Sequence, residues 1–226
     1  MSRTKLRRFE ENKSFHHVVE PSRAELIEEW KLKGSWNETI FQREQPITLE
    51  LGCGKGEYTV ALAKRHPERH FIGVDIKGAR LWRGAKTAVE ESLHNAAFLR
   101  CQIELIDRAF GFQEVDEIWI TFPDPQIKYK RGKHRLTHPD FLARYQKILR
   151  PGGRIKLKTD SEFLHGYTQG VVEMMGLPVY RAFYDIDRQL FDQTSDLHQV
   201  RTHYEGLFRE KGKAITYLEF GFDHEQ

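Results

Sequence analysis

The chain has 226 residues, of which 39% are hydrophobic and 31% charged, and its formal net charge is +3. This length fits one ordinary domain with a sizeable core, and the near balance of charge excludes a uniformly basic protein, so any site for a polyanion must be local. No stretch is apolar enough to span a membrane, and residues 1–15 do not resemble a secretory signal, so we expect a cytoplasmic protein. Cys53 and Cys101 form no metal-like pair, so we expect the protein to be reduced and free of metal.

The first part of the chain is basic and polar. Residues 1–20 predict a flexible arm, which either remains a disordered tail or closes over a polyanion. Residues 22–33 carry Leu26, Ile27 and Trp30 at helical spacing and predict a helix that stops at Gly34. We expect this helix to pack as an N-terminal extension on a single domain that spans residues 21–226.

From Pro46 onward, predicted strands alternate with predicted helices. The predicted strands are 47–51, 70–75, 96–101, 115–122, 154–159, 179–186 and 214–222. Alternation of this kind predicts an α/β fold, in which a doubly wound, mostly parallel, Rossmann-like sheet of seven strands has helices on both faces.

A glycine-rich loop, LELGCGKGEY (49–58), closes the first of these strands. Gly52, Gly54 and Gly56 allow a sharp turn and a close approach of the backbone to a ligand. The dinucleotide fingerprint needs a further glycine where this chain has Glu57, whose carboxylate would repel a pyrophosphate. With Glu50 at the strand end, the spacing instead resembles the first motif of class I S-adenosylmethionine-dependent methyltransferases, whose cofactor has no phosphate. The structural alternative is an ordinary tight turn.

Polar residues that could bind a cofactor also lie at the ends of the next two predicted strands. Asp75 follows the loop by about twenty residues, where such folds place an acid that binds ribose hydroxyls, although alone it could equally be a helix N-cap. After the third strand, Gln102 and Glu104 are both candidates for a contact with adenine.

The fourth strand leads into TFPDPQIKYKRGKHRLTHPDF (121–141). Because ligands of such sheets bind outside the carboxyl ends of the strands, Asp124 falls where chemistry beside a cofactor is expected. Pro123 and Pro125 restrict its backbone, so the carboxylate can be aimed with little loss of entropy. Amino methyltransferases have an aromatic residue where this chain has Gln126, and this difference favours another acceptor.

A basic loop follows Asp124 directly. Its cations are Lys128, Lys130, Arg131, Lys133 and Arg135. A flexible basic loop can neutralise several phosphates of a nucleic acid. The alternative is a solvated, charged loop without a partner.

From about residue 46 onward, the chain resembles the bacterial tRNA (guanine-N7)-methyltransferases. The most specific part is FPDP, followed by the basic loop that ends in HRL, and then Phe141. The resemblance implies that Glu50 and Asp75 bind the cofactor, and that Asp124 serves both the cofactor and catalysis. It implies substrate contacts by Lys128, by the RNA-contacting loop 130–135, by Asp160, and by Thr202 and Glu205 of THYE (202–205).

The family usually has Trp where this chain has Gln126, and an adenine-contacting acid where it has Gln102. The implied reaction transfers a methyl group from S-adenosyl-L-methionine to N7 of a variable-loop guanine in tRNA, which forms 7-methylguanosine. We expect no obligatory protein partner, and either a monomer or a homodimer. Alternatives are a methyltransferase for another RNA or a small molecule, a nicotinamide-dependent dehydrogenase, and a non-catalytic RNA-binding module.

Overall fold

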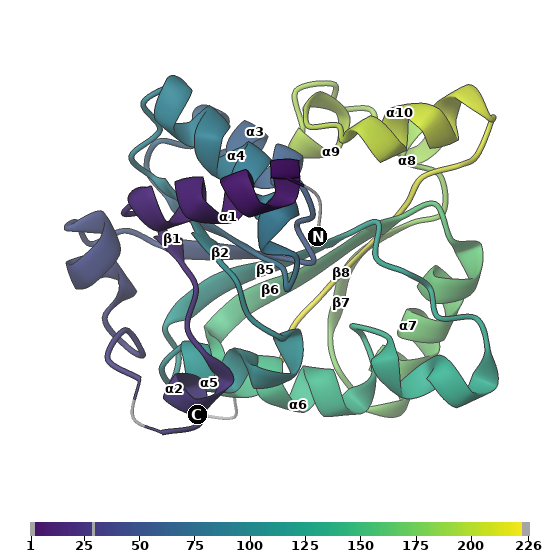
Figure 1. Cartoon of the computed structure of the whole chain (residues 1–226). Coiled ribbons are helices and arrows are strands. Elements are labelled where there is room, and N and C mark those ends of the chain that lie inside the picture. Colours follow the sequence, from purple (N-terminus) through teal and green to yellow (C-terminus); the bar gives the residue numbers. More distant parts are fainter. Residues whose placement is uncertain (1–2, 29, 223–226) are drawn as a thin grey trace.

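A computed structural model describes residues 3–28 and 30–222. Its centre is an eight-stranded sheet in the order β1-β4-β3-β2-β5-β6-β8-β7 (Figure 1). The strands are β1 (Val18–Val19), β2 (Ile47–Leu51), β3 (His70–Val74), β4 (Ala96–Leu99), β5 (Val115–Thr121), β6 (Leu149–Thr159), β7 (Val179–Phe183) and β8 (Thr216–Phe220). The predicted fold class is correct, with one strand more than the sequence predicted.

Parallel pairing runs from β1 to β6 across the sheet, and β8 pairs antiparallel with both β6 and β7. From β2 the chain proceeds outward to β3 and β4, and then returns to β5 on the other side of β2. The order therefore reverses between β2 and β5. In open α/β sheets, this switch point at the carboxyl ends of the strands is where ligands bind.

Helices cover both faces of the sheet (Figure 1). One face carries α1 (Arg3–Ser14), α3 (Glu57–Arg65), α4 (Gly78–Glu90), α8 (Ile186–Gln189), α9 (Asp196–Gln199) and α10 (His203–Glu210). The other carries α2 (Arg23–Ile27), α5 (Ile106–Ala109), α6 (Pro139–Ile148) and α7 (Glu162–Met174). Shorter helical turns are η1 (Asn37–Phe41), η2 (Ile103–Leu105) and η3 (Tyr129–His134).

Two apolar clusters form the core. Leu49, Leu51 and Ile120 belong to the cluster that includes residues of α6 and α7, whereas Tyr58 and Trp119 belong to the one beneath α3 and α4. All five residues of β2 are buried, because helices cover the sheet on both sides. No helix in the described residues is both long and apolar enough to cross a membrane.

The N-terminal segment differs from its prediction. Residues 3–14, expected in a flexible arm, form a helix on α4, where Glu11 accepts a hydrogen bond from the indole of Trp82 and Asn12 donates one to Gly78 O at 3.1 Å. Val18 and Val19 then add the eighth strand, β1, to the free edge of β4. These tertiary contacts give order to a segment whose own sequence is too polar to predict it.

The helix expected over 22–33 is shorter than predicted. Ser22 and Glu25 form a reciprocal capping box that begins α2, which then ends at Ile27. Trp30, assigned to the same helix from its spacing, instead lies edge-on to Trp36 with the ring centres 5.9 Å apart.

Candidate active site

Two adjoining pockets lie at the carboxyl ends of the central strands. The first, about 130 Å³, is called here the carboxylate pocket, and the second, about 300 Å³, the apolar pocket. The carboxylate pocket is lined by Glu50, Gly52, Cys53, Gly54, Lys55, Glu57, Asp75, Arg80, Thr121, Phe122, Thr202 and Tyr204. The apolar pocket is lined by Gly52, Asp75, Ile76, Cys101, Gln102, Ile103, Glu104, His134, Leu136 and Phe141. Gly52 and Asp75 belong to both, so the two pockets form one continuous site.

The glycine loop between β2 and α3 forms the inner wall of this site. Gly52, Gly54 and Gly56 all have left-handed backbones, with φ of 77°, 58° and 70°. A Cβ on Gly56 would lie 2.5 Å from a ring carbon of Phe98, so a larger residue would also collide with the core. The predicted glycines therefore shape the turn that borders the carboxylate pocket.

Asp75 stands where the two pockets meet. Its Oδ2 accepts a hydrogen bond from Gly54 N at 3.0 Å, and its Oδ1 accepts one from Lys77 N at 2.8 Å. Both oxygens are thus oriented by the backbone of the glycine loop and of the turn before α4. A carboxylate held in this way suits a pair of ribose hydroxyls, and ribose binding by Asp75 stays a prediction.

Glu50 is buried in the wall of the carboxylate pocket, with 3% of its surface exposed. It accepts hydrogen bonds from the backbone and hydroxyl of Thr59 and from the hydroxyl of Thr121. Burial raises the pKa of Glu50 to about 7, and these hydrogen bonds oppose the rise. Glu50 therefore ties β2, α3 and β5 together beneath the site.

Asp124 is exposed and lies beyond the walls of both pockets, although Thr121 and Phe122 just before it line the carboxylate pocket. Its Oδ1 accepts a hydrogen bond from Gln126 N at 3.0 Å. Phe122 and Gln126, on either side of the turn, both have left-handed backbones, with φ of 46° and 47°. The turn is therefore sharply bent, and the sequence did not predict this geometry at non-glycine residues.

Arg135 differs from the other cations of the basic loop. It is 8% exposed, and its guanidinium donates to Pro125 O at 3.3 Å and to Gln126 O at 3.0 Å. The same group lies 4.8 Å from the ring centre of Phe163 and 4.3 Å from that of Tyr167. Arg135 therefore fixes the Asp124 turn against α7, and its buried side chain is not presented to an RNA in this structure.

The remaining loop cations are exposed. Lys128 precedes η3, and Lys130, Arg131 and Lys133 lie within it. No carboxylate of the described residues lies within 4.0 Å of any of these four cations. The guanidinium of Arg131 donates to the side-chain oxygen of Gln126 at 3.1 Å. Their charge is thus available to a partner from solution.

The predicted guanine contacts are not gathered in one place. Thr202 lines the carboxylate pocket and caps α10 by accepting from Glu205 N at 3.1 Å. Asp160 lies outside both pockets and pairs with Lys213 at 2.6 Å.

Glu205 itself is fully buried. Its Oε2 lies 2.8 Å from Lys158 Nζ, and its Oε1 accepts from Arg209 at 2.9 Å. Burial lowers the pKa of Lys158 to about 8, and the neighbouring Glu205 opposes this. In this structure Glu205 anchors α10 and does not reach the pockets.

Gln102 and Glu104 both line the apolar pocket, so both remain candidates for an adenine contact. The Gln102 side-chain oxygen already accepts a hydrogen bond from Arg23 at 2.8 Å. This contact links the N-terminal helix α2 to the rim of the pocket.

Sequence reasoning missed several residues of the carboxylate pocket, among them Lys55, Arg80 and Tyr204. Arg80 lies in the first turn of α4, and only the packed structure shows that it reaches the pocket. Glu57, noted only as the residue that breaks the dinucleotide pattern, accepts from His203 N at 2.7 Å and so connects α3 with α10.

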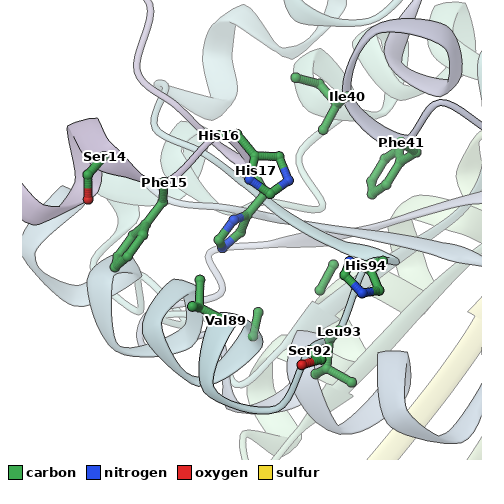
Figure 2. A pocket seen from close by; sticks show the side chains of 12 residues that line it. Ser14, Phe15, His16, His17, Ile40, Phe41, Val89, Ser92, Leu93 and His94 are labelled. Atoms are coloured by element: carbon green, nitrogen blue, oxygen red, sulfur yellow. The ribbon is translucent and has the colours of Figure 1, made fainter.

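A separate cavity of about 290 Å³ lies among the end of α1, η1 and the end of α4 (Figure 2). Phe15, Phe41 and Leu93 give it an apolar lining, and His16 and His94 contribute imidazoles. No Asp or Glu lines this cavity, and none of its lining residues belongs to the paired pockets. It is therefore not the candidate active site.

The strand order, the glycine loop after β2 and the acid after β3 are those of a Rossmann-like fold, and Glu57 in place of a further glycine fits a methyltransferase. Residues 44–218 match the family model described as "Putative methyltransferase". Among solved structures, the 16S rRNA methyltransferase KamB has a TM-score of 0.62 at 14% identity, over 82% of this chain and 92% of that chain. An antibiotic-related methyltransferase has a TM-score of 0.60 at 16% identity, over 91% and 96%. At these low identities, the two similarities show only that the fold is shared.

The chain belongs to the tRNA (guanine-N(7)-)-methyltransferase family. The relative of that name from Christiangramia forsetii is 56% identical over 97% of this chain and 98% of its own length. The relative from Porphyromonas gingivalis is 50% identical over 92% of this chain and 85% of its own length. The family predicted from the sequence is therefore confirmed.

Proposed function

We propose that this protein transfers a methyl group from S-adenosyl-L-methionine to N7 of a guanine in the variable loop of tRNA, forming 7-methylguanosine. The observation that carries the proposal is the position of the Asp124 turn. It joins the carboxylate pocket, through Thr121 and Phe122, to the exposed and unpaired cations of η3. A cofactor site and a phosphate-binding surface thereby meet at one acid.

The chemistry of the two pockets fits S-adenosylmethionine, which supplies an electrophilic methyl group when bound. The carboxylate pocket offers Glu57 and Asp75 beside Lys55 and Arg80, a set that suits a cationic sulfonium and a zwitterionic amino-acid end. The apolar pocket, with Phe141 among its lining residues, suits a purine ring. Asp75 between them suits the ribose hydroxyls.

Guanine N7 has an in-plane lone pair and no proton at neutral pH, so its methylation needs no general base. The protein has to position N7 in line with the methyl group at about 3 Å. The purine becomes cationic as it is methylated. We assign Asp124 to the stabilisation of that charge, because its carboxylate is exposed and held by a rigid turn.

The exposed cations of η3 then hold the RNA backbone near Asp124, and each phosphate contact adds to the salt sensitivity of binding. Thr202 is the best placed of the predicted guanine contacts, because it already lines the carboxylate pocket. Contacts from Asp160 and Glu205 would require both residues to leave their ion pairs. We expect the enzyme to act in the cytoplasm without an obligatory protein partner.

The decisive experiment incubates the purified protein with labelled S-adenosylmethionine and unmodified tRNA transcripts. Reduction followed by aniline then cuts RNA at 7-methylguanosine. We expect a single cut in the variable loop. Label in the RNA without a cut would show that an atom other than guanine N7 accepts the methyl group. No label in any tRNA would contradict the proposal and favour another RNA or a small molecule as the acceptor.

A further inference from the structure

A band of basic residues begins at the carboxylate pocket, at the start of α4, and continues along this helix beyond the site described above. It consists of Lys77, Arg80, Arg83 and Lys86 and is called here the α4 band. We propose that the α4 band is a second phosphate-binding surface for the RNA substrate, on the opposite side of the pockets from η3. This inference rests on the proposed function and extends it to the way in which the RNA is held.

The spacing of the α4 band makes it continuous. Its members follow one another every three residues, and helix positions three apart have neighbouring side chains, with Cβ atoms about 5–6 Å apart. It begins at Arg80 on the rim of the carboxylate pocket. It ends at Lys86, whose ammonium lies 5.1 Å from the ring centre of Trp82. The guanidinium of Arg8, in α1, lies 4.6 Å from the same ring centre. The band thus extends from the pocket across the exposed face of α4.

Nothing in the described residues neutralises this charge. Residues 76–89 contain no acid, and no carboxylate of the described chain lies within 4.0 Å of any member of the band. The acids nearby are engaged by other groups. Glu11 accepts from the indole of Trp82, Glu57 from the backbone of His203, and Glu20 from Asn12. Asp75 accepts from the backbone of Gly54 and of Lys77.

Several other cations on the protein surface do have partners. Lys64 pairs with Glu91 at 2.5 Å, and Lys147 pairs with Asp107 at 2.9 Å. A solvated surface usually mixes charges in this way, so an unpaired run of one sign beside a substrate pocket indicates a binding surface.

The position of the charge within α4 supports the same conclusion. The N-terminus of a helix is its positive end and favours acids, as at the starts of α3, α6 and α7. In α4, Lys77 occupies the N-cap without a side-chain hydrogen bond, and the first turn contains Arg80 and no acid. The carboxylate of Asp75 accepts from the backbone of Lys77 at 2.8 Å at this helix end, whereas the side chains of Lys77 and Arg80 form no ion pair within the described residues and can face a phosphate group.

The two basic surfaces lie on either side of the paired pockets. Arg135, just after η3, packs on α7, whereas α4 covers the opposite face of the sheet (Figure 1). An RNA backbone that crosses the carboxyl edge of the sheet can contact both surfaces. A base between the two contacts would then lie over the carboxylate pocket.

The test uses the double variant Lys77→Gln/Arg83→Gln, since both residues are exposed and neither lines a pocket. The matched control is Lys31→Gln/Arg108→Gln, which removes two exposed, unpaired cations from elsewhere on the protein. Binding of an unmodified tRNA transcript is measured over a range of salt concentrations. Each lost phosphate contact should reduce the slope of log K against log salt by about one, so we expect a reduction of about two.

We also expect the KM for tRNA to rise several-fold, while kcat at saturating tRNA and the affinity for S-adenosylmethionine stay unchanged. The control should match the wild type. If the α4 variant keeps the wild-type slope while the wild type methylates tRNA, the inference is wrong and the proposed function stands. If the wild type neither binds nor methylates tRNA, both fail. Reversal of charge by Arg83→Glu alone gives a second measurement, and it should weaken binding further than Arg83→Gln.

Discussion

Asp124 owes its position to the backbone on both sides of it. The sequence predicted part of this, because Pro123 and Pro125 visibly restrict the chain. It could not predict the left-handed conformations of Phe122 and Gln126, which are rare for such residues and are imposed by tertiary contacts. The side chain of Asp124 lies outside both pockets, so its contact with the cofactor stays a prediction.

Asp124→Asn should separate the charge of this residue from its shape. The amide oxygen can still accept from Gln126 N, so we expect an unchanged melting temperature. Methyl transfer to tRNA should fall by about 100-fold or more, since one charge-stabilising group is removed. Asp140→Asn, an exposed acid on α6, serves as the control. Activity near the wild-type level in Asp124→Asn would remove this residue from the reaction centre.

Arg135 shows a limit of sequence interpretation at the scale of one residue. Within the basic loop it is indistinguishable from Lys133, and only burial separates them. Its planar guanidinium bonds two carbonyls at once, which a lysine cannot reproduce.

Arg135→Lys should therefore lower kcat by loosening the Asp124 turn, while the salt dependence of tRNA binding stays as in the wild type. Lys133→Gln should do the reverse, with a salt slope lower by about one and an unchanged kcat at saturating tRNA. Steady-state kinetics together with binding titrations measure both. If the Arg135→Lys variant instead loses salt dependence of tRNA binding and keeps its kcat, Arg135 contacts the RNA.

At the scale of elements, most strands and helices from residue 46 to β6 followed the sequence pattern, and the segment 187–213 did not. The three short helices α8, α9 and α10 were not predicted, and α8 begins inside the predicted strand 179–186. Lys158 of β6 holds α9 and α10, because it donates to Leu197 O at 2.9 Å and to Val200 O at 3.1 Å and pairs with Glu205. A buried lysine on a strand has no periodic signature, so this connection was not predictable from the sequence.

Glu205→Gln should destabilise this attachment. The change leaves the buried Lys158 without its carboxylate, and breaking such a pair costs about 3–5 kcal/mol. Urea unfolding should show this loss, whereas Glu210→Gln at the exposed end of α10 should change little. If the two variants are equally stable and only Glu205→Gln loses methylation, Glu205 acts on guanine as the sequence resemblance implied.

At the scale of the whole molecule, the alternation of strands and helices was sufficient to predict the fold class and the edge of the sheet that carries the site. It was not sufficient for α1 and β1. A two-residue strand is too short to show alternation, and a polar helix becomes ordered only through its partner, here Trp82 of α4. Glu50 and Asp75 follow directly from their places at strand ends, whereas Arg80 required the packed structure.

Glu50 should make the stability of the whole molecule depend on pH. Its folded pKa, about 7, exceeds the ordinary value of 4.5, so the folded protein binds more protons than the unfolded chain between these values. Stability from this group is therefore lost as pH rises through that window.

Glu50→Gln mimics the protonated form. We expect it to exceed the wild type in unfolding free energy by an amount that grows from pH 4.5 towards pH 7, to roughly 3 kcal/mol. Urea unfolding at several pH values measures the difference, with the exposed Glu90→Gln as the control. A difference that stays constant across the window would show that Glu50 does not titrate there.

The position of β8 affects how the protein folds while it is being synthesised. It is the last described strand along the chain, yet it lies between β6 and β7 in the sheet. A growing polypeptide that has not yet produced residues 216–220 leaves β6 and β7 with open edges, which invite pairing with other chains. Completion of the sheet must therefore wait until synthesis has passed this strand, and chains that stop earlier should aggregate.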